Sequence, residues 1–197
     1  MTIKIDKIIN LDQTLTKKIV GLYTTVFSGE PWNEVFKCDE CGIAYSDKDN
    51  LVKLARGGIC TKNDQCNMPI KLIPFYSGED KLGEKIYLDA INKKGFVGVA
   101  GLKNDELIGF SWGYAMQEKD TPSVMFTKIN PLFEEQGYDR TKVFYAAETG
   151  IVENFRQNGF GTSLIKGRLL RAKECGFESV SFRTKNAKLV SIFENMF

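Results

Sequence analysis

A pair of glycines where a strand becomes a helix restricts the fold of this chain more than any other feature. The apolar run "KVFYAAETGIV", residues 142–152, predicts a strand with one embedded charge, and "GFGTSLIKGRLLRAKECG", residues 159–176, predicts a helix. Gly159 and Gly161 stand at the junction. A helix start presents unpaired N–H groups and a positive dipole end, and glycine lets an anion approach them without a Cβ in the way. The pattern indicates a pyrophosphate-binding loop, with an ordinary glycine-containing turn as the alternative.

Two better-known phosphate motifs do not fit this loop. The dinucleotide fingerprint needs a third glycine where Leu164 stands, and the P-loop needs a Gly-Lys-Ser/Thr run that does not follow here. The helix itself is amphipathic. Its apolar residues are predicted to face the core and its basic residues to face solvent: Leu164, Leu169 and Ala172 inward, and Lys166, Arg168 and Arg171 outward.

The remaining periodicities complete an α/β (α+β) order with a mixed sheet. They predict a strand at 2–8, helices at 12–26 and 79–95, a hairpin at 96–116 around "KNDE", a short helix at 131–137, a strand at 177–184 and a last helix at 186–197. A cysteine-rich segment, residues 36–76, has little periodicity. We expect it to be an insertion in a single domain that spans residues 1–197.

The glycine loop and its neighbours resemble the GNAT superfamily of acyl-CoA-dependent N-acyltransferases. Arg156, Gly159 and Gly161 match the family pattern Arg/Gln-x-x-Gly-x-Gly/Ala, and the strand, loop and helix around them follow the family's order. The hairpin at 96–116 suits the second and third family strands, and only the cysteine-rich segment lies outside the resemblance. The resemblance implies a mixed, mainly antiparallel twisted sheet flanked by helices, with acetyl-CoA as cosubstrate.

The resemblance also implies which residues hold acetyl-CoA. The backbone of Ile151 and Val152 would pair with the pantetheine arm, in a splay between two strands. The pyrophosphate would lie against the loop residues Arg156, Gln157, Asn158, Gly159, Phe160, Gly161 and Thr162. Asn186, at the start of the last helix, would touch the pantetheine or serve only as the helix N-cap.

Glu148 is a charge inside the apolar strand at 142–152. A carboxylate in a mostly buried strand costs free energy unless it is paired or hydrogen-bonded. Burial favours the protonated form of a carboxyl group, which suits a general base near neutral pH, and the family often places its base on this strand. The alternative is a salt-bridge partner or a solvated sheet position; Glu153 is a weaker candidate for the base. No histidine is present, which excludes imidazole as base or metal ligand.

Two features depart from the family pattern. Many members carry a tyrosine in the last helix that protonates the leaving thiolate, and the corresponding residue here is Phe193. Ser191 and Tyr145 are the candidate substitutes. The family also continues with two more strands, so we expect either a fragment or a sheet that another chain completes, as in a homodimer.

Four of the five cysteines cluster in the insertion, namely Cys38, Cys41, Cys60 and Cys66. "CDECG" is a zinc-knuckle-like turn, and the last two cysteines supply a looser second pair. Clustered cysteines in a reducing compartment more often bind metal than form disulfides. Four thiolates would make a closed, structural zinc site, with unbound thiols and disulfides as the alternatives. Cys175 is predicted to be an ordinary buried side chain.

Charge and hydropathy indicate which classes of partner to expect. The 27 basic and 25 acidic residues nearly cancel to a net charge of +2, which argues against nucleic-acid binding. No run is long enough for a membrane span and the start lacks a signal-peptide core, so a cytoplasmic protein without a membrane partner is expected.

The favoured interpretation is an N-acetyltransferase that acts on a primary amine of a small-molecule or peptidyl acceptor. Trp32, Glu34 and Trp112 would line the acceptor pocket, with core packing as the alternative role of either tryptophan. The competing interpretations are a zinc-ribbon-bearing binding protein or an acyl-CoA sensor, each on a catalytically degenerate acyltransferase scaffold.

Overall fold

The computed structural model describes residues 4–8, 13–30, 32, 34–41, 43–45, 58–60, 66, 68–69, 72–74, 76, 82–116, 135–184 and 187–194. The chain divides into two compact units, one of residues 1–12 with 89–197 and the other of residues 13–88. The predicted insertion at 36–76 falls inside the second unit, and its boundaries stay a prediction.

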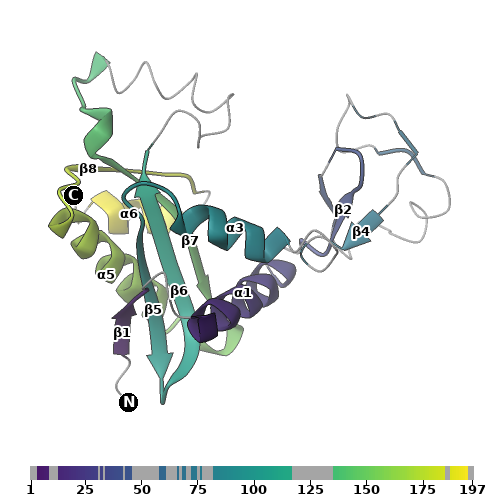
Figure 1. The fold of residues 1–197 in the computed structure, drawn as a ribbon, viewed down its shortest axis with the longest axis horizontal. Helices are drawn as coiled ribbons and strands as arrows, with labels where there is room; N and C mark the ends of the chain where they lie inside the picture. The colour runs from purple at the N-terminus through teal and green to yellow at the C-terminus, as the bar shows by residue number, and fades with distance from the viewer. Residues whose placement is uncertain are drawn as a thin grey trace. The chain divides into compact units, whose positions relative to one another are not determined.

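The first unit contains a five-stranded sheet with the order β1-β5-β6-β7-β8. Its strands are β1 (Lys4–Lys7), β5 (Val97–Lys103), β6 (Glu106–Ala115), β7 (Val143–Ile151) and β8 (Ser179–Phe182). The first four strands pair antiparallel, and β8 pairs with β7 in parallel. Figure 1 shows β5, β6 and β7 as the long strands of this sheet. The predicted mixed, mainly antiparallel sheet is confirmed.

The hairpin of β5 and β6 forms for local reasons. Its two-residue turn places Asn104 at φ 51° and Asp105 at φ 61°. A type I′ turn needs this left-handed conformation at both positions, and Asn and Asp tolerate it better than most residues. Lys103 and Glu106 pair directly beside the turn. The hairpin predicted at 96–116 is therefore confirmed.

Helix α5 (Phe160–Glu174) packs along one face of this sheet, against β5, β6 and β7 (Figure 1). The helix α6 (Ala187–Glu194) contributes Phe193 to the same core. That core consists of Val97, Ala115, Phe144, Ala146, Ile165, Leu169, Ala172, Phe177 and Phe193. Cys175 is exposed rather than buried, which corrects the prediction: it follows the last helical residue, and Phe177 fills the core there.

The second unit contains α1 (Gln13–Ser28) and a small antiparallel sheet. The sheet has the order β3-β2-β4, with β2 (Phe36–Cys38), β3 (Ala44–Tyr45) and β4 (Leu72–Pro74). The helix α3 (Leu82–Ile91) begins in this unit and ends in the first. The helix was predicted from the spacing of Leu15, Ile19, Leu22 and Val26; α1 buries Ile19 and Val26 of these, together with Tyr23 and Phe27. The helix expected at 131–137 lies mostly outside the described residues. Within the described ranges, no helix has the length and apolar character needed to cross a membrane.

Candidate active site

A β-bulge in β7 lies directly beside Glu148. Trp112 on β6 stands opposite Glu148, but the next residue, Gly113, stands opposite Ala146. Ala147 is therefore an extra residue in β7. A bulge of this kind bends the strand and increases its twist, and bulges are common next to active sites.

Glu148 shares one face of the sheet with three aromatic side chains. Trp112 and Tyr114 are two residues apart on β6, so their side chains point to the same face. On β7, Glu148 stands opposite Trp112 and Tyr145 stands opposite Tyr114. Trp112 is buried, whereas Glu148 is half-buried. Burial and then the neighbouring Tyr114 raise the pKa of Tyr145; the charge of Glu148 raises it further, while Arg183 lowers it. The carboxylate and a phenol that keeps its proton at neutral pH thus lie close enough to interact.

β7 separates from β8 at the bulge. The parallel pairing with β8 ends at Ala146, and residues 147–151 pair with β6 alone among the described strands. The N–H of Val152 donates to the carbonyl of Ile108 on the β6 side at 3.0 Å. Alternation along the strand therefore directs the backbone of Ile151 toward the edge that faces away from β6. The family resemblance predicts the pantetheine arm at this edge.

The end of β7 leads into the glycine loop and the start of α5. Gln157 and Gly159 have φ values of 63° and 79°, the left-handed region that favours glycine. The N–H of Ser163 makes the first i→i−4 bond of the helix, to the carbonyl of Gly159 at 3.0 Å. The N–H groups before it have no partner further back in the helix. They belong to Phe160, Gly161 and Thr162, and an anion would take them as donors.

The two glycines serve different purposes. Gly159 requires its positive φ, and the space where its Cβ would lie is open. A Cβ on Gly161 would come within 3.1 Å of Cδ1 of Ile151, tighter than an ordinary contact. The loop is tied to β7 across the short 3₁₀ turn η3 (Glu153–Phe155) by Arg156, whose Nε donates to the Ile151 carbonyl at 3.2 Å. A side chain at 161 would therefore disturb both the loop and the end of β7.

A buried arginine lies behind the bulge, on the α5 face of the sheet. Arg168 is 2% exposed, so its predicted outward position is wrong. Its Nη1 donates to the carbonyl of Trp112 at 3.0 Å and to that of Glu148 at 3.3 Å. Burial lowers the pKa of Arg168 to about 9 and the charge of Glu148 raises it, so the guanidinium is cationic at neutral pH. The physical reason for its inward position is that carbonyls at a bulge need donors the ladder does not provide.

Neither a family model nor a curated protein matches this sequence. Solved structures do match. An aminoglycoside acetyltransferase from an uncultured soil metagenomic sample, in complex with sisomicin, aligns with a TM-score of 0.51 at 13% identity over 98% of this chain and 86% of its own. The aminoglycoside N-acetyltransferase AAC(6')-Iy, in complex with a CoA-containing bisubstrate analogue, aligns with a TM-score of 0.48 at 14% identity over 97% and 85%. The match to the sisomicin-bound acetyltransferase and the mixed, mainly antiparallel five-stranded sheet of this chain indicate the same fold. The chain has the GNAT fold.

In this GNAT-fold chain Phe193 is a core residue. It is 5% exposed, and its ring stacks on Phe182 with the centroids 3.9 Å apart. The guanidinium carbon of Arg168 lies 5.8 Å from the Phe193 ring centroid. Of the two candidate substitutes for the missing tyrosine, Tyr145 lies on the Glu148 face of the sheet, and Ser191 is exposed on α6. The position of Tyr145 suits a proton donor better.

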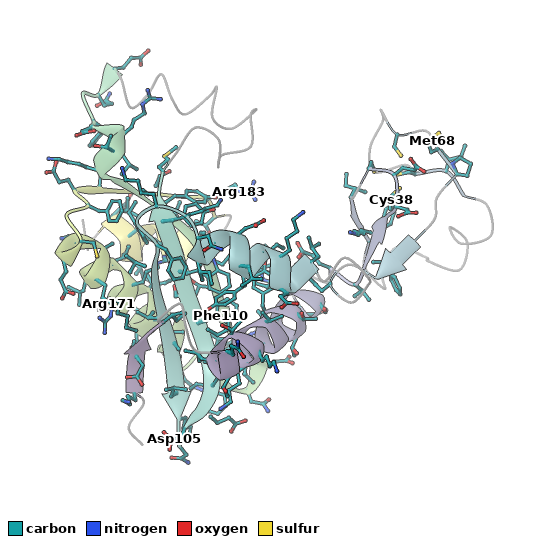
Figure 2. All side chains as sticks on the ribbon, in the orientation of Figure 1. Cys38, Met68, Asp105, Phe110, Arg171 and Arg183 are labelled. Carbon is teal, nitrogen blue, oxygen red and sulfur yellow. The ribbon has the colours of Figure 1, made fainter. Side chains whose placement is uncertain are left out.

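The structure brings the four predicted cysteines of the second unit together. The Sγ atoms of Cys38, Cys41, Cys60 and Cys66 all lie within 4.8 Å of one another. Two backbone bonds close the loops that carry them, from Cys38 N–H to Ile43 and from Cys60 N–H to Met68. Figure 2 shows Cys38 and Met68 in the region of β2 and β4. All four are free thiols, so the disulfide alternative does not hold for them.

The spacing and chemistry of this cluster fit a tetrahedral zinc ion. Cys41 and Cys60 have their Sγ atoms 3.6 Å apart, and ideal Zn–S bonds of about 2.3 Å place tetrahedral sulfurs about 3.8 Å apart. A backbone hydrogen bond from Met68 lowers the pKa of Cys66, but burial and the three neighbouring thiols raise it to about 12. Four thiolates this close need a cation between them. The hydroxyl of Tyr45, 3.2 Å from Cys60 Sγ, would add an outer hydrogen bond.

Of the remaining predicted site residues, Trp32 and Glu34 belong to the second unit and Trp112 to the first. Trp32 is 55% exposed, and its ring centroid lies 5.4 Å from that of Phe27. Glu34 accepts a hydrogen bond from the Tyr76 hydroxyl; burial raises the pKa of Glu34 and this bond lowers it, with burial dominant. Trp112 is a fully buried core residue that stacks on Phe110, which Figure 2 labels on the sheet. Asn186 lies outside the described residues.

A cavity of about 550 Å³ adjoins the glycine loop on the side of β1 and β5. Its lining residues are Ile5, Lys103, Asn154, Phe155, Asn158, Phe160 and Ser163. None of them belongs to β7 or β8, so the cavity is separate from the Glu148 face and the edge of β7.

Proposed function

We propose that the chain is an acyltransferase that transfers the acetyl group of acetyl-CoA to a primary amine of a small-molecule or peptidyl acceptor, by direct attack in a ternary complex. One observation carries the proposal: the edge of β7 that β8 leaves carries Glu148 at its bulge and runs straight into the open start of α5. A single strand thus connects a candidate base, a free backbone edge and a group of anion-binding N–H donors. The fold shared with the sisomicin-bound acetyltransferase supports the same class of reaction.

Acetyl-CoA would bind along this strand. The pyrophosphate would accept hydrogen bonds from the loop and the first turn of α5, formed by residues 156–162, because these N–H groups precede the helix's own ladder. The pantetheine would lie beside Ile151, whose backbone faces the open edge, and pass next to Val152, whose own N–H and carbonyl are already bonded to Ile108 and Phe155. Asn186 would complete the pantetheine contacts from the start of α6.

The transfer needs one base and one proton donor. The amine would lose a proton to Glu148, directly or through water, and its nitrogen would attack the thioester carbonyl. A backbone N–H near Ile151 would stabilise the oxyanion. Attack forms the C–N bond; the oxyanion then re-forms the carbonyl and the C–S bond breaks, so the sulfur leaves as thiolate, a fair leaving group because its thiol has a pKa of about 8.5. The protonated phenol of Tyr145 would return a proton to it.

The four-cysteine cluster would hold a structural zinc ion. With four thiolates as ligands, no position remains for water, so the metal would stabilise the second unit and take no part in the transfer. The acceptor would lie on the Glu148 face of the sheet, beside the half-buried Tyr145.

Two measurements test this function. Titration calorimetry with acetyl-CoA tests binding, and thiol release on a panel of amines tests transfer; the panel should include sisomicin, basic peptides and simple diamines. We expect acetyl-CoA to bind and at least one amine to increase thiol release above the slow hydrolysis seen without acceptor. Binding without release for any amine would instead favour the acyl-CoA sensor. Absence of binding would favour a zinc-bearing binding protein on a degenerate scaffold.

A further inference from the structure

Packing alone does not account for Arg168. Its neighbours on the same side of α5 are apolar core residues, Ile165, Leu169 and Ala172. A buried guanidinium costs free energy that an apolar side chain of similar volume would not. Its Nε has no hydrogen-bond partner among the residues that the structure describes, so the side chain is not placed to satisfy its own donors. The hydrogen bonds that it makes are concentrated at one place, the bulge in β7.

We propose that Arg168 is a positioning residue, which holds the β7 bulge and thereby orients the Glu148 carboxylate for transfer; this inference rests on the proposed function. Trp112 and Glu148 stand opposite each other beside the bulge. The Nη1 of Arg168 donates to the backbone carbonyls of both, to Trp112 at 3.0 Å and to Glu148 at 3.3 Å. The Arg168 guanidinium therefore connects β6 and β7 at the point where their pairing register shifts. A shift of the guanidinium would move the backbone from which the Glu148 side chain projects.

Further contacts keep the guanidinium in this place. Ser111, with no exposed surface, has its Oγ 2.8 Å from Oγ1 of Thr149 and 3.4 Å from the Glu148 carbonyl. Thr149 Oγ1 is in turn 3.4 Å from Nη1 of Arg168. The rings of Phe144 and Phe193 lie 6.0 Å and 5.8 Å from the guanidinium carbon. Polar groups at the bulge and aromatic rings beside it therefore define a single location for the cation.

Arg168 acts from the opposite face of the sheet and touches no reacting atom. The Glu148 side chain points to the face with Trp112 and Tyr114, whereas Arg168 reaches the Glu148 carbonyl from α5. The hydrogen bonds of Arg168 within the described part of the chain go to Trp112, Glu148 and Thr149, none of which belongs to the glycine loop, residues 156–162. Loss of Arg168 should therefore slow the chemical step and leave acetyl-CoA binding almost unchanged.

The test compares three variants of the full chain: Arg168→Met, Arg168→Lys and the exposed control Lys166→Met on the same helix. Methionine keeps most of the volume without donors, and lysine keeps the charge with a less extended donor group. We expect kcat to fall about 10- to 100-fold in Arg168→Met, the size expected when a reacting group is misplaced by about 1 Å. Arg168→Lys should recover part of that loss, the affinity for acetyl-CoA should change less than about threefold, and the control should match the parent protein.

The outcomes separate this inference from the proposed function. Unchanged kcat in folded Arg168→Met, or a parallel loss of acetyl-CoA affinity, would overturn the positioning role. If Arg168→Met does not fold, Arg168→Lys carries the same comparison. If the parent protein transfers to no amine, the proposed function fails, and hydrogen exchange at residues 147–149 still reports on the bulge. Trp112 gives a second structural signal: the chain has 2 tryptophans, and in a Trp32→Phe background Trp112 is the one that remains. Its near-UV circular dichroism then reports on the strand beside the bulge. Unchanged hydrogen exchange and unchanged dichroism in Arg168→Met would refute the bulge contact itself.

Discussion

The two sheets of this protein are organised by different chemistry. The five-stranded sheet of the first unit packs on α5 through a cluster of aliphatic and aromatic side chains. The buried cluster of the three-stranded sheet consists of Cys38, Tyr45 and Cys60, with Phe36 and Ile43 packed against it. Burial of apolar area at about 25 cal/mol per Å² can stabilise the first, whereas the described residues of the second bury mainly cysteine and tyrosine side chains.

We expect the three-stranded sheet to need a source of stability other than apolar burial. Ordering the backbone costs about 1–2 kcal/mol per residue, a cost that a large core offsets and a few side chains cannot. Structural zinc binding to small peptides contributes about 10–16 kcal/mol near neutral pH. The second sheet should therefore depend on its metal, whereas the first should not.

Metal removal should have the largest effect. We expect close to one zinc per chain, and a strong chelator or Cys38→Ser should release it. Amides of residues 36–45 and 58–60 should then exchange rapidly, while β5, β6 and β7 remain protected. Metal analysis together with hydrogen exchange measures both parts.

The matched control for this experiment is Cys175→Ser, which alters an exposed cysteine outside the cluster and should retain the zinc. A metal-free protein whose residues 36–45 stay protected would contradict the dependence on zinc. Collapse of both sheets after chelation would show that the two units are not independent.

The next effect concerns the loop that connects the first sheet to its cosubstrate. In Gly161→Val the added branched side chain would meet Ile151 and occupy the approach to the first N–H groups of α5. We expect the Kd for acetyl-CoA to rise about 100-fold, equivalent to about 2.7 kcal/mol, with a smaller rise in Gly161→Ala. Calorimetry provides the measurement. The control is Leu170→Val, a β-branched residue at an exposed position of the same helix; equal affinity in a folded Gly161→Val would remove the loop from the binding site.

Local signals were sufficient for much of the first unit. Alternation and the Asn104–Asp105 turn predicted the β5–β6 hairpin, because a type I′ turn depends only on its own two residues. The glycine loop was likewise visible, since the positive φ of Gly159 and the helix start that follows are local requirements. The metal-binding chemistry of clustered cysteines predicted that the four would lie together. Their separation along the chain did not allow the distances between the sulfur atoms to be predicted.

Long-range pairing explains what the sequence did not reveal. Arg168 follows Leu164 by four residues and Ile165 by three, so helical spacing alone would put it on the buried stripe. Its charge favoured the solvent, and the carbonyl that justifies burial belongs to Trp112, 56 residues away. The bulge at Ala147 is equally invisible, because it exists only in the register between β6 and β7.

Glu148→Gln tests the chemistry of the first sheet without disturbing its packing. The amide keeps the shape of the carboxylate but cannot accept the proton of the amine. We expect kcat to fall about 10²-fold, with the Kd for acetyl-CoA nearly unchanged. Steady-state thiol release and calorimetry give the two numbers, and Glu174→Gln on the exposed surface of α5 is the control. An equal rate at neutral pH would assign the proton transfer to another group or to water.

The smallest effect tests whether the second unit also has a contribution that is independent of zinc. Burial raises the pKa of Glu34 despite the hydrogen bond from Tyr76, so folding favours the protonated form. A raised folded-state pKa contributes stability that is present below the unfolded pKa and is lost as pH rises through the folded value. Glu34→Gln cannot lose a proton, so relative to the parent its stability should increase as pH rises through the raised pKa of Glu34. We expect the melting temperature of Glu34→Gln at pH 8 to exceed that of the parent by a few degrees at most, since 1 kcal/mol corresponds to about 2–4 °C for a chain of this size. The control Glu106→Gln, at an exposed position, should show no gain. A lower melting temperature of Glu34→Gln at pH 8 would show instead that the hydrogen bond between the charged Glu34 and Tyr76 outweighs the cost of burying the carboxylate.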